Sequence, residues 1–196
     1  MDTGLRHPLV AAAFAWATAT KDVAPSQEQY CESRDHLNAR MERLRSTMMK
    51  EGISETTAFL LHAILSEIGG NSFDHNIGQW RDIPGAFFGH ATEEKELIVA
   101  LADRGQGIRT TLQRVRPSMR SDEEALRVAF LERISGRAPE RRGNGLKFVR
   151  QTIMEDGIDL FFQSGAATYS LEEKRESWGR TEEQIPGCFA TLTIRR

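Results

Sequence analysis

The pattern of apolar and polar positions divides the chain into an N-terminal helical part and a longer part that mixes helices and strands. Residues 8–20 form a short alanine-rich apolar run, which predicts a short helix rather than the apolar centre of a cleaved signal peptide. In residues 30–50, apolar side chains recur at spacings of four, three and four, as on one face of a helix. The apolar positions of this stripe are Leu37, Met41, Leu44 and Met48. The stripe predicts packing on the parent domain, with the seam of a homodimer as the alternative.

A longer helix is predicted from Ser54, a suitable N-cap residue, to about Ile77. Polar side chains fall at positions i, i+4, i+7 and i+8 of this helix and therefore share one stripe, which consists of Glu67, Asn71, Asp74 and His75. The adjacent Gly69 and Gly70 lie inside the helix, where each costs about 0.8 to 1 kcal/mol relative to alanine. We therefore expect another group to approach the helix backbone closely there. Taken alone, the polar stripe is equally well explained as a solvated face.

Runs of apolar residues later in the chain predict strands, at residues 86–91, 96–102, 158–163, 167–171 and 188–194. The run at 96–102 is almost continuously apolar and is expected to form a central strand that is buried on both faces. Ser164 and Gly165 predict a turn, and the highly charged residues 172–186 predict a mobile excursion.

Two glycine-containing segments flank an arginine-rich stretch. Asp103-Arg104-Gly105-Gln106-Gly107 directly follows the predicted central strand, and Gly143-Asn144-Gly145-Leu146 opens a helix that is predicted to end at Gly157. Residues 108–142 between them hold nine arginines and no lysine against five acidic residues, a net charge of about +4, and one amphipathic helix around residues 125–131. Arginine binds phosphate oxygens through two nitrogens at once, so Arg141 or Arg142 is a candidate phosphate contact.

Residues 67–76, 103–107 and 143–146, in this order, resemble the N box and the two glycine boxes of the GHKL ATPase superfamily. This superfamily includes gyrase-type topoisomerases, heat-shock-90-type chaperones, histidine kinases, MutL repair proteins and anti-sigma-factor kinases. The resemblance implies the Bergerat ATP-binding fold, an α/β (α+β) sandwich whose mixed, mostly antiparallel sheet is covered by helices on one face. It implies an ATP-binding domain at residues 51–196 with a lid at 108–142, preceded by an N-terminal helical extension at residues 1–50.

The resemblance also implies ATP and Mg²⁺ as ligands, and the chemistry of the residues agrees. Asp103 can accept a hydrogen bond from the exocyclic amine of adenine, where guanine carries a carbonyl, and Gly105 and Gly107 would leave room for the ring. Asn71 offers an amide oxygen to Mg²⁺, and Glu67 is placed as the general base. Gly143 and Gly145 would free backbone amides for phosphate oxygens. The predicted nucleotide-binding residues are Asn71, Asp74, His75, Asp103, Gly105, Gly107, Ile108, Arg142, Gly143, Asn144, Gly145, Leu146 and Cys188.

One box departs from the family pattern. Cys188 stands at the start of the last predicted strand, where family members often have a threonine. The thiol is a weak hydrogen-bond donor, so the contact that this threonine makes to an adenine-linked water is not expected here.

These features predict a Mg·ATP-binding domain that acts on a partner protein as a kinase of the serine/threonine or histidine type, or as an ATPase, in bacterial-type signalling. The alternative is a non-catalytic, ATP-sensing module whose lid controls partner binding. A third interpretation, a fragment of a sensor histidine kinase with His36 as phospho-acceptor, is disfavoured because the acidic residue that usually follows this histidine is missing and the chain is too short for a dimerisation hairpin. His36 is expected at the surface.

Composition limits the remaining classes of partner and compartment. The chain of 196 residues is 39% hydrophobic and 28% charged, which suits one compact domain, and its net charge of −2 indicates neither a nucleic-acid nor a membrane partner. Cys31 and Cys188 have no paired spacing and indicate neither a disulfide framework nor a zinc site. No apolar run approaches the ~20 residues that a membrane-spanning helix needs. We therefore expect a cytoplasmic protein.

Overall fold

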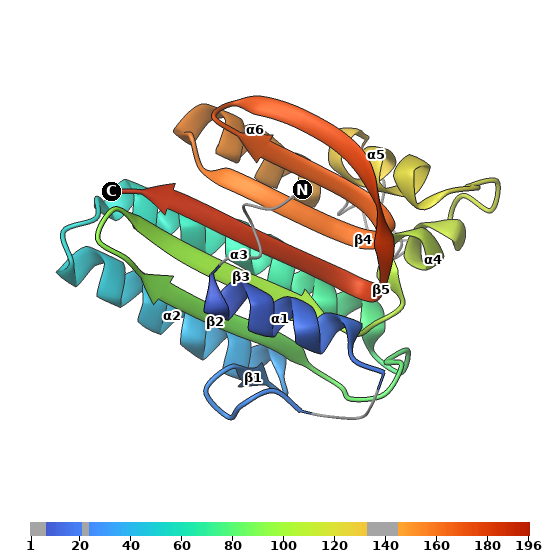
Figure 1. Ribbon diagram of the computed structural model, residues 1–196, viewed down its shortest axis with the longest axis horizontal. Coiled ribbons are helices and arrows are strands. Elements are labelled where there is room, and N and C mark those ends of the chain that lie inside the picture. The colour runs from blue at the N-terminus through green and yellow to red at the C-terminus, as the bar shows by residue number, and fades with distance from the viewer. Residues whose placement is uncertain (1–6, 21–23, 133–144) are drawn as a thin grey trace.

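The computed structural model describes residues 7–20, 24–132 and 145–196. These residues form an α+β fold with an open five-stranded sheet in the order β1-β2-β3-β5-β4, and every pair of neighbouring strands in it is antiparallel. The strands are β1 (Tyr30–Cys31), β2 (Ala86–Thr92), β3 (Glu96–Asp103), β4 (Asp159–Glu172) and β5 (Arg175–Arg195). The helices are α1 (Pro8–Thr18), α2 (Arg34–Lys50), α3 (Glu55–Asn76), α4 (Gly107–Gln113), α5 (Asp122–Leu131) and α6 (Gly145–Asp156) (Figure 1).

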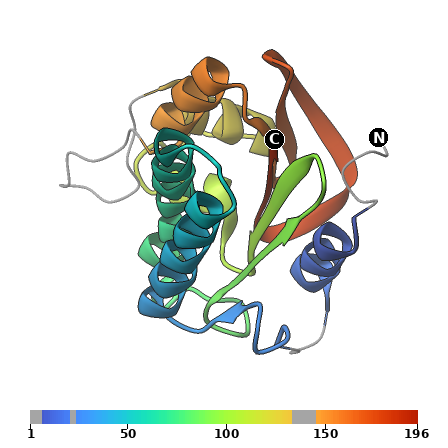
Figure 2. The same ribbon diagram turned by 90° about the vertical axis from the view of Figure 1, so that its left-hand side faces the viewer.

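Helices lie on both faces of the sheet, so the prediction of helices on one face only is wrong. The larger core lies between the sheet and the layer that contains α2, α3 and α6, whereas α1 covers part of the opposite face (Figure 2). The buried side chains of α1, including Leu9 and Trp16, pack on Phe87 of β2 and Phe189 of β5. Helices cover both faces because the central strands are apolar on both faces, and each face has to be removed from water.

The central strand is β3, as predicted. It pairs with β2 on one side and β5 on the other, and all of its residues from Leu97 to Asp103 are buried. Asp103 is therefore the last residue of a buried strand, at the end of the sheet.

The chain after residue 158 differs from the prediction. Ser164 and Gly165 do not form a turn; they form an irregularity inside the continuous strand β4, where the pairing register with β5 shifts. The predicted excursion at 172–186 is also wrong, because residues 175–185 extend β5 and pair with the second half of β4 through a tight turn at Glu173 and Lys174. The charges misled the prediction because a two-stranded ribbon can expose polar side chains along its length.

The close approach predicted for the two glycines of α3 is confirmed. A Cβ on Gly69 would lie 2.7 Å from Cδ2 of Leu37, and a Cβ on Gly70 would lie 3.1 Å from Nη2 of Arg34. The apolar stripe of α2 is buried against the same core, so these side chains pack on the parent domain. Since β1 also pairs with β2, the predicted N-terminal extension contributes to the same sheet and core.

Most predicted helix boundaries are confirmed. The hydroxyl of Ser54 caps α3 by accepting a hydrogen bond from the Thr57 amide at 3.1 Å, and Gly157 follows α6 with a φ of 69°. Helix α4 was not predicted, because it begins inside the glycine box and has only seven residues. None of the described helices combines the length and apolar character that crossing a membrane requires.

Candidate functional site

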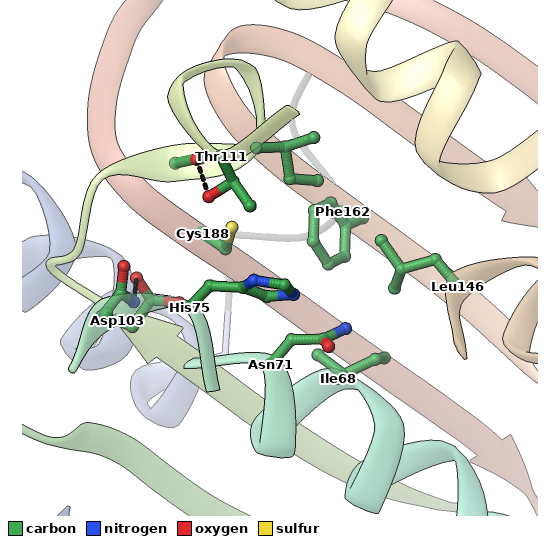
Figure 3. Close-up of a pocket in the computed structure, with 11 residues that line it drawn as sticks. Ile68, Asn71, His75, Asp103, Thr111, Leu146, Phe162 and Cys188 are labelled. Atoms are coloured by element: carbon green, nitrogen blue, oxygen red, sulfur yellow. Dashed lines mark hydrogen bonds between the residues drawn. The ribbon is translucent and has the colours of Figure 1, made fainter. Parts of the chain in front are cut away.

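A small pocket of about 70 Å³, partly open to solvent, lies where α3, the end of β3, α4, α6 and the β4–β5 pair meet. Seven of the predicted nucleotide-binding residues line it: Asn71, His75, Asp103, Gly107, Ile108, Leu146 and Cys188 (Figure 3). Residues that the sequence analysis did not select complete the lining: Ile68, Asn76, Thr111 and Phe162. The structure therefore brings segments from five separate parts of the chain to one cavity.

Asp103 is the buried acid of this pocket, with only 3% of its surface exposed. Its Oδ2 accepts a hydrogen bond from the Ser72 hydroxyl at 2.9 Å. Its Oδ1 accepts bonds from the Gly105 amide at 2.9 Å and from Nδ2 of Asn76 at 3.3 Å. The carboxyl group is thus fixed in orientation by α3 on one side and by its own turn on the other.

Burial raises the pKa of the Asp103 carboxyl above its ordinary value, because the ionised form loses its hydration. Hydrogen bonds from the Gly105 backbone, the Ser72 hydroxyl, the Cys188 backbone and the Asn76 amide act in the opposite direction, since each of them stabilises the ionised form. A buried acid surrounded by donors is a strong acceptor for a further N–H group.

The glycines of the Asp103–Gly107 segment have roles that differ from the expectation. A Cβ on Gly105 would collide with the side-chain amide of Asn76, so protein atoms rather than a ligand fill the space beside Gly105. Gly107 adopts a φ of 75°, which favours glycine, and a Cβ there would lie 3.0 Å from the Pro186 carbonyl oxygen. The expectation that Gly105 leaves room for a ring is therefore wrong, whereas Gly107 does line the pocket.

The polar stripe of α3 is divided between the pocket and its surroundings. The side chains of Asn71 and His75 point into the pocket (Figure 3). Asp74 is not one of the lining residues and pairs instead with Arg34 of α2 at 2.6 Å. Glu67 is exposed and also outside the lining. Only part of the predicted row thus faces the cavity.

Glu67 instead lies beside the start of α6. A Cβ on Gly145, the first residue of α6, would stand 2.5 Å from Oε2 of Glu67, so the missing side chain allows this close approach. Leu146 follows and lines the pocket. The other predicted residues of the second glycine box, Arg142, Gly143 and Asn144, lie outside the described residues, as does Arg141.

The segment around Cys188 is held by Ser164, a residue that the sequence analysis predicted in a turn. Oγ of Ser164 accepts a hydrogen bond from the Ile108 amide at 3.0 Å and donates one to the Gly187 carbonyl at 3.1 Å. The Cys188 thiol lies 3.7 Å from the same oxygen. Burial and the nearby Asp103 charge raise the pKa of the Cys188 thiol well above its ordinary value, so this group stays neutral and apolar in character.

Arg104, inside the glycine box, has a structural role on the opposite side of the sheet. Its side chain is 1% exposed, donates to the Trp16 carbonyl at 3.1 Å and pairs with Asp82. Its guanidinium also lies 5.7 Å from the centre of the Trp16 ring. Successive side chains at the end of a strand point to opposite faces of the sheet. Asp103 therefore lines the pocket, while Arg104 contacts α1 on the other face.

The pocket residues could hold Mg²⁺ only if waters and a bound phosphate supplied most of the ligands of the ion. Asn71 would supply one oxygen, and Mg²⁺ is commonly held by one or two protein oxygens together with substrate phosphates and waters. Among the described residues, no group of three or more His, Cys, Asp or Glu side chains could hold a metal ion alone.

No protein-family model matches this chain, and no curated protein sequence matches it either.

Proposed function

We propose that this protein binds Mg·ATP in the pocket around Asp103 and transfers the terminal phosphoryl group to a partner protein or to water. In this proposal the fold is a GHKL-type ATP-binding domain of the Bergerat class. The observation that carries the proposal is Asp103 itself, a 3% exposed carboxylate at the wall of a pocket whose other polar side chains include Asn71 and His75. A buried carboxylate that already costs hydration free energy is best explained by a ligand that needs an acceptor there.

The arrangement of the pocket suits the parts of an adenine nucleotide. Ile108, Leu146 and Phe162 offer apolar surface for a flat base, and Asp103 accepts from its amino group. Asn71 supplies the oxygen for Mg²⁺, which would neutralise phosphate charge when bound. The start of α6, at Gly145, is favourable for phosphate because the amides of a helix N-terminus are unpaired.

In the same proposal, Glu67 is the general base. Its carboxylate is exposed and lies beside Gly145, at the side of the pocket to which α6 contributes. A base in this position can take the proton of a water or of a partner's hydroxyl group that approaches from solvent. We also propose the cytoplasm as the compartment, since Cys31 and Cys188 are both free thiols.

A second candidate function is a non-catalytic ATP-sensing module. The position of Glu67 favours it, because this acid is not among the described residues that line the pocket. In a sensing module the bound nucleotide would order residues near the pocket and so control a partner, without turnover.

Labelled ATP distinguishes the two functions. Purified protein is incubated with Mg²⁺ and ATP that is labelled in the γ-phosphate, and free phosphate and labelled protein are followed with time. A kinase or ATPase releases ADP, and Glu67→Gln abolishes this release while ATP binding persists. Glu55→Gln, an exposed acid in the first turn of the same helix, is the matched control and keeps wild-type turnover. Saturable ATP binding with no ADP in the wild type would favour the sensing module.

A further inference from the structure

Asn76, the last residue of α3, is a buried polar residue of the pocket that the proposed function has not used. Only 4% of its surface is exposed, and its side chain lies against Gly105 in the space where any other residue at position 105 would place a Cβ. Its amide therefore sits inside the Asp103–Gly107 turn rather than on the helix surface.

The orientation of the Asn76 amide is determined by its partners. Its Oδ1 accepts a hydrogen bond from the backbone N–H of Gln106 at 3.1 Å, and its Nδ2 donates to the backbone carbonyl of Ser72 at 2.8 Å. A backbone N–H can only donate and a backbone carbonyl can only accept, so the reversed amide would lose both bonds. The group that Asn76 presents to Oδ1 of Asp103, at 3.3 Å, is consequently an N–H donor.

The two carboxyl oxygens of Asp103 therefore differ in how easily their present hydrogen-bond donors can be replaced by a ligand. Oδ1 receives Nδ2 of Asn76 and the Gly105 amide, and neither donor can leave without moving backbone or breaking the Asn76 bonds. Oδ2 receives the hydroxyl of Ser72, whose hydrogen can turn to another acceptor. Of these two oxygens, Oδ2 is therefore the one whose hydroxyl partner can give way to a ligand amine.

Asn76 also maintains the acceptor character of this carboxyl group. A protonated Asp103 could donate its hydrogen to the Ser72 hydroxyl oxygen at Oδ2, but not to the N–H groups of Asn76, Gly105 and Cys188, which can only donate. Loss of the fixed N–H of Asn76 would remove one donor and free the carboxyl group to rotate or to hold a proton.

We propose that Asn76 is a positioning residue that holds Asp103 as the acceptor for the amino group of adenine and so sets the discrimination between adenine and guanine nucleotides. The proposal rests on the nucleotide binding proposed above. The side-chain hydrogen bonds described for Asn76 reach Ser72, Asp103 and Gln106 rather than Asn71 or α6, so we expect its effect on the base and not on Mg²⁺ and the phosphates.

The test compares the affinities for ATP and GTP, each with Mg²⁺, of wild type, Asn76→Ala and Asn38→Ala. Asn38 is an exposed asparagine on α2 and serves as the matched control. Wild type and Asn38→Ala are expected to prefer ATP. In Asn76→Ala the ATP-to-GTP affinity ratio falls by about tenfold, the effect of one hydrogen bond to a charged group, while the dependence of binding on Mg²⁺ is kept. A purely structural role would weaken both nucleotides equally.

The outcomes separate this inference from the proposed function. If wild type binds neither nucleotide, the proposed function fails, and the inference fails with it. If wild type discriminates and folded Asn76→Ala discriminates equally, the inference alone is overturned. Should Asn76→Ala not fold, Asn76→Asp keeps the shape of the side chain but replaces the N–H donor, and it is expected to lose the preference as well. In the wild type, the side-chain amide NMR signals of Asn76 are expected to shift when ATP binds, and unshifted, rapidly exchanging signals would overturn the inference.

Discussion

Gly145 and Glu67 come from helices far apart in the sequence, yet a Cβ on Gly145 would stand 2.5 Å from the Oε2 atom of Glu67. The start of α6 therefore rests against the polar stripe of α3, next to the pocket that Asn71 and Leu146 line. This contact joins the second glycine segment to the acid that we propose as the general base.

Replacing Gly145 with alanine is expected to affect turnover more than stability. The atom in the way is the end of an exposed, flexible side chain, so Glu67 can move aside, and the free energy of unfolding should change by less than about 1 kcal/mol. The displaced carboxylate is then misplaced for proton transfer, and ADP release falls by about tenfold or more. Urea unfolding and a steady-state ADP assay check the two effects. Normal turnover with lowered stability would contradict this role of the contact.

Substituting Asn71 tests the proposed metal site. We expect Asn71→Ala to bind ATP equally well with and without Mg²⁺, because the oxygen that would hold the ion is gone. Equilibrium titrations of ATP at saturating Mg²⁺ and in a chelator measure this effect. Asn38→Ala on α2 keeps the wild-type response to Mg²⁺. A wild-type response in Asn71→Ala would refute the role of this residue.

The raised pKa of Asp103 predicts a pH dependence of stability with a defined sign. Because the folded protein holds this proton more tightly than the unfolded chain, the contribution of Asp103 is fully present below its ordinary pKa of 3.8 and is lost as the pH rises through the raised value. Relative to Asp103→Asn, wild type should therefore lose about 1.4 kcal/mol of stability for each unit by which the pKa is raised. Urea unfolding of both proteins from about pH 4 to about pH 8 measures this difference. A difference that stays constant with pH would contradict the raised pKa.

The two glycines of α3 should respond differently to alanine. In Gly69→Ala the new Cβ would meet Cδ2 of Leu37 at 2.7 Å, and Leu37 is fully buried, so we expect a loss of about 1 to 3 kcal/mol in the free energy of unfolding. In Gly70→Ala it would meet the guanidinium of Arg34, whose side chain is 45% exposed and can move. The helix propensity of alanine then stabilises the protein by up to about 1 kcal/mol. Equal effects in urea unfolding would show that the packing of α2 on α3 is not as described.

The elements that the sequence predicted well are those whose signals are local. Ser54 and Gly157 mark helix ends through their own conformational preferences, and the apolar run of β3 can be satisfied only at the centre of a sheet. The hairpin of β4 and β5 was missed because its pairing is non-local and its surface charges resemble those of a loop. Gly165, read as a turn, instead accommodates a register shift within a strand.

The sequence predicted which segments form the candidate site, but not the hydrogen bonds that connect their side chains. The spacing of Asn71 and His75 on one helix identified two side chains of the pocket. Ser72 and Asn76 are four residues apart on the same helix, and this spacing could have identified both as neighbours of one group, but nothing in the sequence connects them to Asp103. The outward position of Asp74 depends on Arg34, a residue of another helix, and only the packing of α2 on α3 reveals it.

Calorimetric titration of ATP and GTP into wild type and Asp103→Asn tests the central claim most directly. We expect saturable binding of ATP to wild type, weaker binding of GTP, and a loss of about 1 to 3 kcal/mol of ATP binding free energy in Asp103→Asn, because a charge-assisted hydrogen bond to the adenine amine is removed. Asp35→Asn, an exposed acid on α2, should bind ATP as wild type does. No binding of ATP to folded wild type, or equal ATP affinity in Asp103→Asn, would contradict the assignment of this pocket.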